Sequence, residues 1–467
     1  MRAWLGWAAG SRRRPLRWLV PGLVALTVAG TAAAYSLPEL YGGRDSTCFW
    51  NIGVVNGGTI NIAYPDADAN YWAAGFTLPA GATLQLHGAY PHARFASISS
   101  YNLLGVPLDA LVDYQITPDR GSRNPFRSGV PRTVARRAFT LTLSASPPPH
   151  PLAADQRSGR PARNTLFITP RGDTTGLHIL LWRVYVPDRR QGLRGGVPLP
   201  RPVLRLADGT VETGSALCHT LTSQVHRLPD ISALLIPASQ YAALRYQPGV
   251  PPYFPARRRP VWRVQYNRAY LLGLYAGPAY RPSLTGVTKS GQAGFFPNID
   301  NQYARAAINR KLGRIVAFRG TLPTTPHTVD GERFLRRNTQ LRYVSFCMNE
   351  SVLTTRVMGC VDDEQIPLGP HRRYVVVTSR RADRPSNATA RCGVAWLRWS
   401  PRGDGGSDHD FGWMQLRNML PSPSFDHAIQ STRVPGDERR VMGPYLPTGT
   451  YYSGKRAFER LGCPVAR

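Results

Sequence analysis

The chain has 467 residues, of which 42% are hydrophobic and 10% aromatic, and this composition excludes an intrinsically disordered protein. It is too long for a single core and suits two domains of about 170–200 residues each. The formal net charge is +30, and all but three of the 58 basic residues are arginine, scattered without a nucleic-acid-binding motif. Binding of nucleic acid or another polyanion through these arginines is therefore an alternative. We favour an anionic component of a cell envelope as the electrostatic partner.

Residues 1–35 have the pattern of an export signal or an N-terminal membrane anchor. Five arginines precede or begin an apolar stretch over 18–34, which ends in small residues. The stretch is short for a membrane-spanning helix and contains Pro21 and Gly22, although an uncleaved anchor with its basic end in the cytoplasm also fits. The run Arg12–Arg14 resembles a twin-arginine export motif, so the export route stays open. We predict an exported protein, located outside the cell or in its envelope.

From residue 48 onward the sequence consists of two stretches that are similar to each other. The segment Tyr64–Tyr71 returns as Phe296–Tyr303, displaced by 232 positions. Further matches follow in the same order, with displacements between 232 and 250. They include Gly88/Gly320, Arg94/Arg342, Asp113/Asp363 and Arg183/Arg417. A repeat of this length indicates two related domains in tandem.

Strand patterns dominate both copies. Short apolar or alternating runs separated by turn residues cover 82–87, 95–101, 139–144, 165–169 and 178–186, and then 315–319, 343–348, 374–379 and 394–399. Only 237–245 and 424–431 have a helical pattern. These patterns predict an all-β protein of two tandem jelly-roll-like β-sandwich domains related by internal duplication. We place the first repeat at 48–226, a helix plus Pro/Arg-rich linker at 227–261, and the second repeat at 262–467.

An even number of cysteines in an exported chain favours disulfides over metal binding. Because no cysteine or histidine spacing suits zinc, we predict no metal and no cofactor. Near the ends of the two copies, Cys218 and Cys463 occupy matching positions, and Cys48 is the only other cysteine of the first copy. This predicts a Cys48–Cys218 disulfide and leaves the pairing in the second copy open. The six predicted disulfide cysteines are Cys48, Cys218, Cys347, Cys360, Cys392 and Cys463.

Several strands of the first copy carry a family resemblance. The segments Arg94–Ile98, Arg137–Leu141 and Leu180–Pro187, together with Asn164, resemble the uncharacterised bacterial domain of unknown function 1214. That family has a tryptophan where this chain has Ala96. The resemblance covers about 80–200 and is thin in the second copy; it implies a jelly-roll-like β-sandwich and no established reaction. The whole chain also resembles exported actinobacterial proteins without an assigned function.

The repeated charged residues allow two interpretations. They could form two copies of a polar site that binds a carboxylate or sugar through arginine. Alternatively, each domain holds an internal Arg–Asp pair that fastens neighbouring strands. We favour the structural interpretation, because duplicated domains keep their scaffold and diverge in their sites. The residues concerned are Arg94/Arg342, Asp113/Asp363 and Arg183/Arg417.

The second copy gathers four carboxylates where the first has Asp113 alone. Paired carboxylates can provide acid–base chemistry or hold a divalent cation, but they can also form salt bridges with the surplus arginines, which we favour. If a catalytic site exists, the predicted acid–base pair is Glu350 and Asp363. The predicted binding residues are Asn349, Asp362, Glu364 and Arg342.

The segment Asp66–Asn70 imitates the start of a calcium loop, but Tyr71 stands where that loop needs glycine. We therefore interpret it as a turn that leads into a strand. No nucleophile elbow or phosphate-binding loop occurs. The leading hypothesis is an exported cell-envelope protein that binds a glycan, a lipid-linked polymer or a protein partner. The alternative is a hydrolase that acts on envelope polysaccharide.

Overall fold

The computed structural model describes residues 44–149, 164–172, 176–222, 236–275, 295–335 and 338–465. The predicted signal or anchor segment lies outside these residues. Among the helices of the described segments, none is long and apolar enough to cross a membrane.

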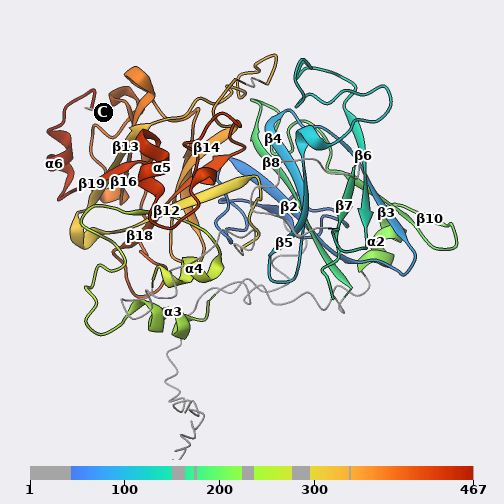
Figure 1. Cartoon of the computed structure of the whole chain (residues 1–467), viewed down its shortest axis with the longest axis horizontal. Helices are drawn as coiled ribbons and strands as arrows, with labels where there is room; N and C mark the ends of the chain where they lie inside the picture. Colours follow the sequence, from blue (N-terminus) through green and yellow to red (C-terminus); the bar gives the residue numbers. More distant parts are fainter. Residues whose placement is uncertain are drawn as a thin grey trace, which may run out of the picture. The chain divides into compact units, whose positions relative to one another are not determined.

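The first copy is a β-sandwich of two five-stranded sheets (Figure 1). One sheet has the order β1 (Gly53–Val55), β2 (Ala69–Thr77), β8 (Leu177–Pro187), β4 (Ala93–Tyr101) and β5 (Pro107–Val112). The other has the order β10 (Val211–Glu212), β9 (Arg201–Arg205), β3 (Thr83–Ala89), β6 (Ala138–Ser144) and β7 (Thr165–Phe167). Alternate residues of β6 are buried, as expected for a strand with one face on the core. That core contains Trp72, Trp182 and Leu141.

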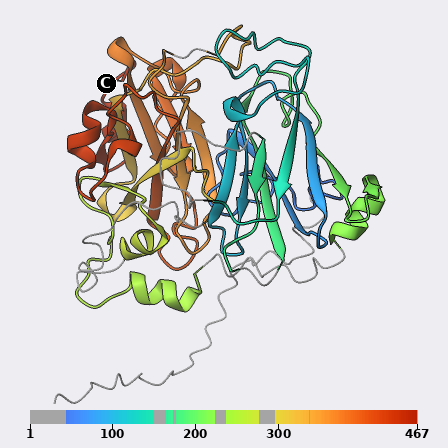
Figure 2. The same ribbon diagram turned by 45° about the vertical axis from the view of Figure 1, so that its right-hand side comes forward.

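The second copy repeats this architecture. Its first sheet has the order β11 (Trp262–Val264), β12 (Asn301–Asn309), β18 (Phe411–Met419), β14 (Tyr343–Asn349) and β15 (Val357–Asp362). Its second sheet has the order β17 (Val394–Arg398), β16 (Arg373–Ser379), β13 (Ile315–Thr321) and β19 (Thr448–Tyr452). Figure 2 shows these strands, in yellow to red, gathered apart from the blue-to-green strands of the first copy.

Helices are short and lie outside the sheets. The α-helices are α2 (Gly214–Thr222), α3 (Ala238–Arg245), α4 (Arg268–Gly273), α5 (Glu438–Met442) and α6 (Lys455–Glu459). Single 3-10 turns are η1 (Asp113–Gln115), η5 (Arg310–Leu312), η6 (Pro370–Arg372), η7 (Arg381–Asp383), η8 (Ala390–Cys392), η9 (Ile429–Ser431) and η10 (Gly443–Tyr445). The helix predicted over 237–245 is confirmed by α3. The helix predicted over 424–431 is wrong, because only the 3-10 turn η9 forms there.

The order and pairing of the strands confirm the internal duplication. Strands β11 to β19 have the same partners as β1 to β9, including a parallel pair in each copy, β6–β7 and β16–β17. The register also matches, since Tyr71 pairs with Arg183 and Tyr303 pairs with Arg417. Both copies have an irregularity at the same point, between Ser100 and Tyr101 in β4 and at the corresponding step of β14.

The sheets that contain β4 and β14, here called the central sheets, meet at the interface between the copies. An apolar cluster with residues of both, including Tyr185 and Tyr343, lies between them. The contacts are reciprocal: Arg417 donates to the carbonyl of Tyr64 at 2.7 Å, and its counterpart Arg183 donates to the carbonyl of Phe296 at 3.0 Å. Equivalent residues therefore make equivalent contacts, as expected for an approximate two-fold relation between the copies.

Candidate functional site

The repeated residues Arg94/Arg342 and Asp113/Asp363 form ion pairs between the copies rather than within them. Arg94 of β4 donates to both carboxylate oxygens of Asp363 at 2.8 and 2.6 Å, and it also contacts Glu364. In return, Arg342 lies 3.4 Å from Asp113. The prediction of one internal pair in each domain is therefore wrong. These residues join the two halves of the molecule, and this accounts for their presence in both copies.

Each aspartate of these pairs also binds the backbone of its own copy. Asp113 accepts a hydrogen bond from Ala96 N at 2.9 Å, and Asp363 accepts one from Val344 N at 3.0 Å. Burial raises the pKa of Asp113, and the guanidinium of Arg342 opposes that rise. The arrangement satisfies buried charges, which would otherwise be costly. Arg342 and Asp363 thus have structural partners.

The predicted acid–base pair is not brought together. Glu350 is 1% exposed and binds Arg402 at 2.9 Å and Ser400 at 2.8 Å. Asp363 binds Val344 near the other end of β14. Glu350 lies six positions after Val344 in the chain, which corresponds to roughly 20 Å of extended strand. Glycosidase carboxylates lie about 5–10 Å apart.

The predicted binding residue Asn349 is also fully buried, at the end of β14. Its Nδ2 donates to the carbonyl of Cys347 at 3.3 Å. Asn349 is not among the residues that line the pocket described below. Of the predicted binding residues, Asp362 and Glu364 line a pocket.

Three disulfides form, and the predicted Cys48–Cys218 pair is confirmed. The second copy contains Cys347–Cys360 and Cys392–Cys463. Three disulfides indicate an oxidising, exported environment.

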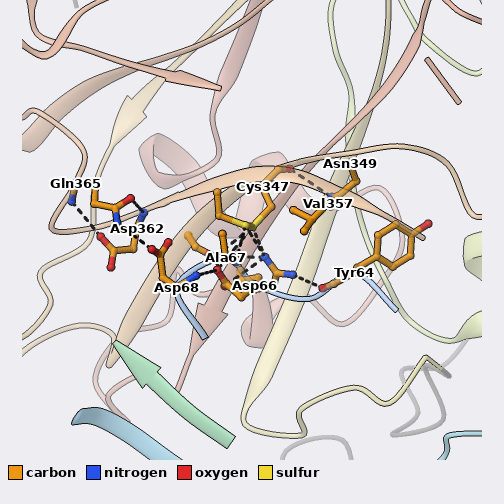
Figure 3. The surroundings of a disulfide bond; sticks show 12 residues. Tyr64, Asp66, Ala67, Asp68, Cys347, Asn349, Val357, Asp362 and Gln365 are labelled. Carbon is orange, nitrogen blue, oxygen red and sulfur yellow. Dashed lines mark hydrogen bonds and ion pairs between the residues drawn. A yellow bond between two sulfur atoms is a disulfide. The ribbon is translucent and has the colours of Figure 1, made fainter. Parts of the chain in front are cut away.

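The Cys347–Cys360 disulfide links directly opposite residues of β14 and β15 (Figure 3). The corresponding residues of the first copy are Ser99 and Ala110, which pair in the same register without a covalent link. Beside the disulfide, Arg417 contacts Cys347 and lies 3.3 Å from Asp66. This corner of the interface therefore differs chemically from its counterpart in the other copy.

A pocket of about 790 Å³ opens next to this corner, between the copies. The first copy contributes residues of 56–58, 67–70 and 186–193, and the second contributes residues of 329–330 and 357–365. Two carboxylates from different copies, Asp68 and Asp362, line it. Gln365 holds both: its Nε2 donates to Asp68 Oδ1 at 2.9 Å, and its backbone N–H donates to Asp362 Oδ1 at 3.0 Å. Figure 3 shows these three residues beside one another.

The two pocket carboxylates have perturbed acidities. Burial, then the neighbouring charge of Asp363, raises the pKa of Asp362 to about 7. Burial, then the charge of Asp362, raises the pKa of Asp68 well above its ordinary value. The charge of Asp362 thus makes ionisation of Asp68 less favourable, while Asp363 and Asp66 have the same effect on Asp362.

Among the described residues, most buried carboxylates bind an arginine. Neither Asp68 nor Asp362 forms an ion pair with an arginine within the described ranges, whereas the carboxylates that do include Asp66, Asp113, Asp188, Glu350, Asp363, Asp408 and Glu438. The pair also occurs once, since the counterpart of Asp362 in the first copy is Val112. Sequence reasoning missed Asp68, which lay in the segment interpreted as a turn.

The chain matches no protein-family model and no curated protein, so the resemblance to the domain of unknown function stays a prediction. Solved structures that are similar to it at low identity include two bacterial proteins. An uncharacterised protein from Burkholderia cenocepacia has a TM-score of 0.43 and 11% identity, over 84% of this chain and 79% of its own. A protein from Vibrio parahaemolyticus has a TM-score of 0.35 and 9% identity, over 83% of this chain and 89% of its own.

Proposed function

We propose that this protein acts in the cell envelope and binds a glycan in the pocket between its two copies. The observation that carries this proposal is the pair Asp68 and Asp362, two carboxylates that pair with no arginine of the described residues and line a pocket of about 790 Å³. Ligand pockets commonly have volumes of about 300–1,000 Å³. Carboxylate oxygens accept hydrogen bonds from sugar hydroxyls, and such charge-assisted bonds are the stronger kind.

The walls of the pocket also suit a sugar chain. Four glycines, Gly57, Gly58, Gly192 and Gly359, keep parts of the lining free of side chains, so that a ligand can approach the backbone closely. Apolar contacts for the C–H groups of a sugar ring come from Val186, Leu193, Val329, Val357 and Met358. An acidic lining disfavours nucleic acid and other polyanions at this site, despite the net charge of +30.

A second candidate function is hydrolysis of envelope polysaccharide, with Asp68 and Asp362 in place of the pair predicted from sequence. The observation that favours it is the pKa of Asp362, raised to about 7 by burial and by Asp363. A carboxyl group that keeps its proton near neutral pH can act as a general acid. Asp68 would then supply the second carboxylate of the reaction.

Calorimetric titration of the purified full chain with β-1,4-linked hexose and hexosamine tetrasaccharides tests the proposal. At least one tetrasaccharide should bind, and Asp68→Asn should weaken that binding about tenfold or more. The control is Asp208→Asn, the same change at an exposed turn outside the pocket. Absence of binding, or equal binding by Asp68→Asn, would contradict the proposal. Release of new reducing ends by the wild type but not by Asp362→Asn would instead identify the hydrolase.

A further inference from the structure

Some acidic residues of the pocket lining form ion pairs with arginines, and two do not. Three of its acidic residues have arginine partners: Asp188 binds Arg132, Glu364 binds Arg94, and Asp330 binds Arg189. Asp68 and Asp362 remain. Arg190 also lines the pocket, but it makes no ion pair with either of them in the part of the chain described. Among the acidic residues of the described lining, these two are therefore the ones whose carboxyl groups no arginine neutralises through an ion pair.

Hydrogen bonds hold the two carboxylates in place, but they do not use every acceptor oxygen. Glu364 N and Gln365 N both donate to Asp362 Oδ1 at 3.0 Å, and Gln365 Nε2 donates to Asp68 Oδ1. The other oxygen of Asp68, Oδ2, is shielded from solvent and has no hydrogen-bond partner in the described ranges. A buried acceptor without a donor is costly, so a ligand that supplies a donor gains free energy there.

The pocket lining indicates which chemical group of a ligand would donate hydrogen bonds to these carboxylates. The described lining contains no aromatic ring, so recognition depends on hydrogen bonds and charge rather than on stacking. A calcium ion needs six to eight oxygen ligands, of which this pair supplies few. The one group of three metal-ligating side chains found among the described residues is Asp66 with Cys347 and Cys360, whose sulfurs are joined in a disulfide. A primary ammonium carries three donors and one positive charge, which matches two neighbouring carboxylates.

We propose that the pocket binds the ammonium group of its ligand, through Asp68 and Asp362, and so selects a glycan with free amino groups over a neutral or N-acetylated one. This inference rests on the proposed glycan-binding function and adds the chemical class of the ligand. The raised pKa values agree with it, because burial first and neighbouring carboxylates second disfavour the charged forms of Asp68 and Asp362, and a bound ammonium offsets this cost.

The test compares three tetrasaccharides with the same linkage, made of glucosamine, N-acetylglucosamine or glucose, titrated at pH 7.5 into the purified full chain. The glucosamine tetramer should bind at least about tenfold more tightly than the other two. Asp68→Asn should remove this preference while the protein keeps its circular dichroism spectrum, since asparagine can still accept from Gln365. Asp208→Asn, which removes one exposed carboxylate elsewhere, should keep it.

The outcomes separate the two proposals. Equal affinity for all three tetrasaccharides overturns the ammonium inference and leaves glycan binding intact, whereas no binding of any overturns both. Tight binding of CaCl₂ alone, with loss of the glucosamine preference, overturns the inference in favour of a metal site. A lysine tetrapeptide serves to identify the source of the amine. If it binds more tightly than the glucosamine tetramer and loses affinity in Asp68→Asn, ammonium recognition is supported and the natural amine belongs to a peptide.

Discussion

Replacing Asp362 with asparagine should stabilise the ligand-free protein at pH 8. Asp362 is 2% exposed, and burial together with the charge of Asp363 raises its pKa from 3.8 to about 7. A group whose pKa is raised on folding contributes stability that is fully present below pH 3.8 and is lost as the pH rises through about 7. At about 1.4 kcal/mol per pKa unit, ionisation of Asp362 costs about 4 kcal/mol of the unfolding free energy by pH 8.

Asparagine avoids this cost and keeps the local hydrogen bonds. Its Oδ1 can accept from Glu364 N and Gln365 N, which bond Asp362 at 3.0 Å. At pH 8 the unfolding free energy of Asp362→Asn should therefore exceed that of the wild type by up to about 4 kcal/mol. Near pH 4 the two proteins should converge.

Urea unfolding of the full chain between pH 4 and pH 8, followed by tryptophan fluorescence, measures this difference. Asp208→Asn serves as the control and should leave the shape of the pH profile unchanged, because hydrogen bonds from Thr210 lower the pKa of exposed Asp208, which therefore stays ionised over this range. If Asp362→Asn is less stable than the wild type at pH 8, the pocket does not hold an unrelieved carboxylate pair. A difference of the same size at pH 4 and pH 8 would show that the effect is not ionisation. If Asp362→Asn is more stable than the wild type and also loses the preference for the glucosamine tetramer, Asp362 serves ligand binding at the expense of stability.

Three further predictions concern the surroundings of the pocket. Exchanging Cys347→Ser and Cys360→Ala, which installs the residues of the first copy, should keep the fold and cost about 3 kcal/mol in urea unfolding, as expected for a 13-residue loop; failure to fold would contradict the match between the copies. Arg94→Met should cost about 3–5 kcal/mol in the same assay, because it leaves Asp363 buried without its partner, and a loss below about 1 kcal/mol would argue against that ion pair. Glu350→Gln should lower the melting temperature and leave tetrasaccharide affinity unchanged in calorimetry. A loss of affinity would show that Glu350 contributes to the binding site.

The fold was largely predictable because the repeat is visible in residue order. Each copy has the predicted strands, and β3, β6 and β16 lie where alternating or apolar runs placed them. The error at 424–431 has a physical reason. Phe425, Ala428 and Ile429 have the spacing of a helical face and are all buried, but a turn and a 3-10 turn bury them instead.

The partners of the repeated charges could not be predicted in the same way. A repeat shows that Arg94 corresponds to Arg342 and Asp113 to Asp363. It does not show whether each arginine contacts the aspartate of its own copy or of the other, since both arrangements have the same sequence. The choice depends on which faces of the two sandwiches meet, and the central sheets meet here.

The pair Asp68 and Asp362 could not be predicted from a local sequence pattern either. Asp68 and Asp362 come from different copies, and their proximity exists only once the interface forms. Asp68 was set aside because its neighbours fail as a calcium loop, which is a test of local spacing. The acidic run at Asp362–Glu364 was visible, and two of its three members do line the pocket.

The departures from two-fold symmetry are what single out this corner of the molecule. The first copy has Ser99, Ala110 and Val112, and the second copy has Cys347, Cys360 and Asp362 in the same registers. Likewise Asp66, beside Arg417, corresponds to the neutral Asn298 in the other half. A duplicated interface needs the same supports on both sides, so changes confined to one side are not required to join the copies. They gather at one end of the interface, where they add a crosslink and buried negative charge next to a pocket. These changes on one side of the interface have a common explanation if the pocket binds a ligand that requires the buried negative charge.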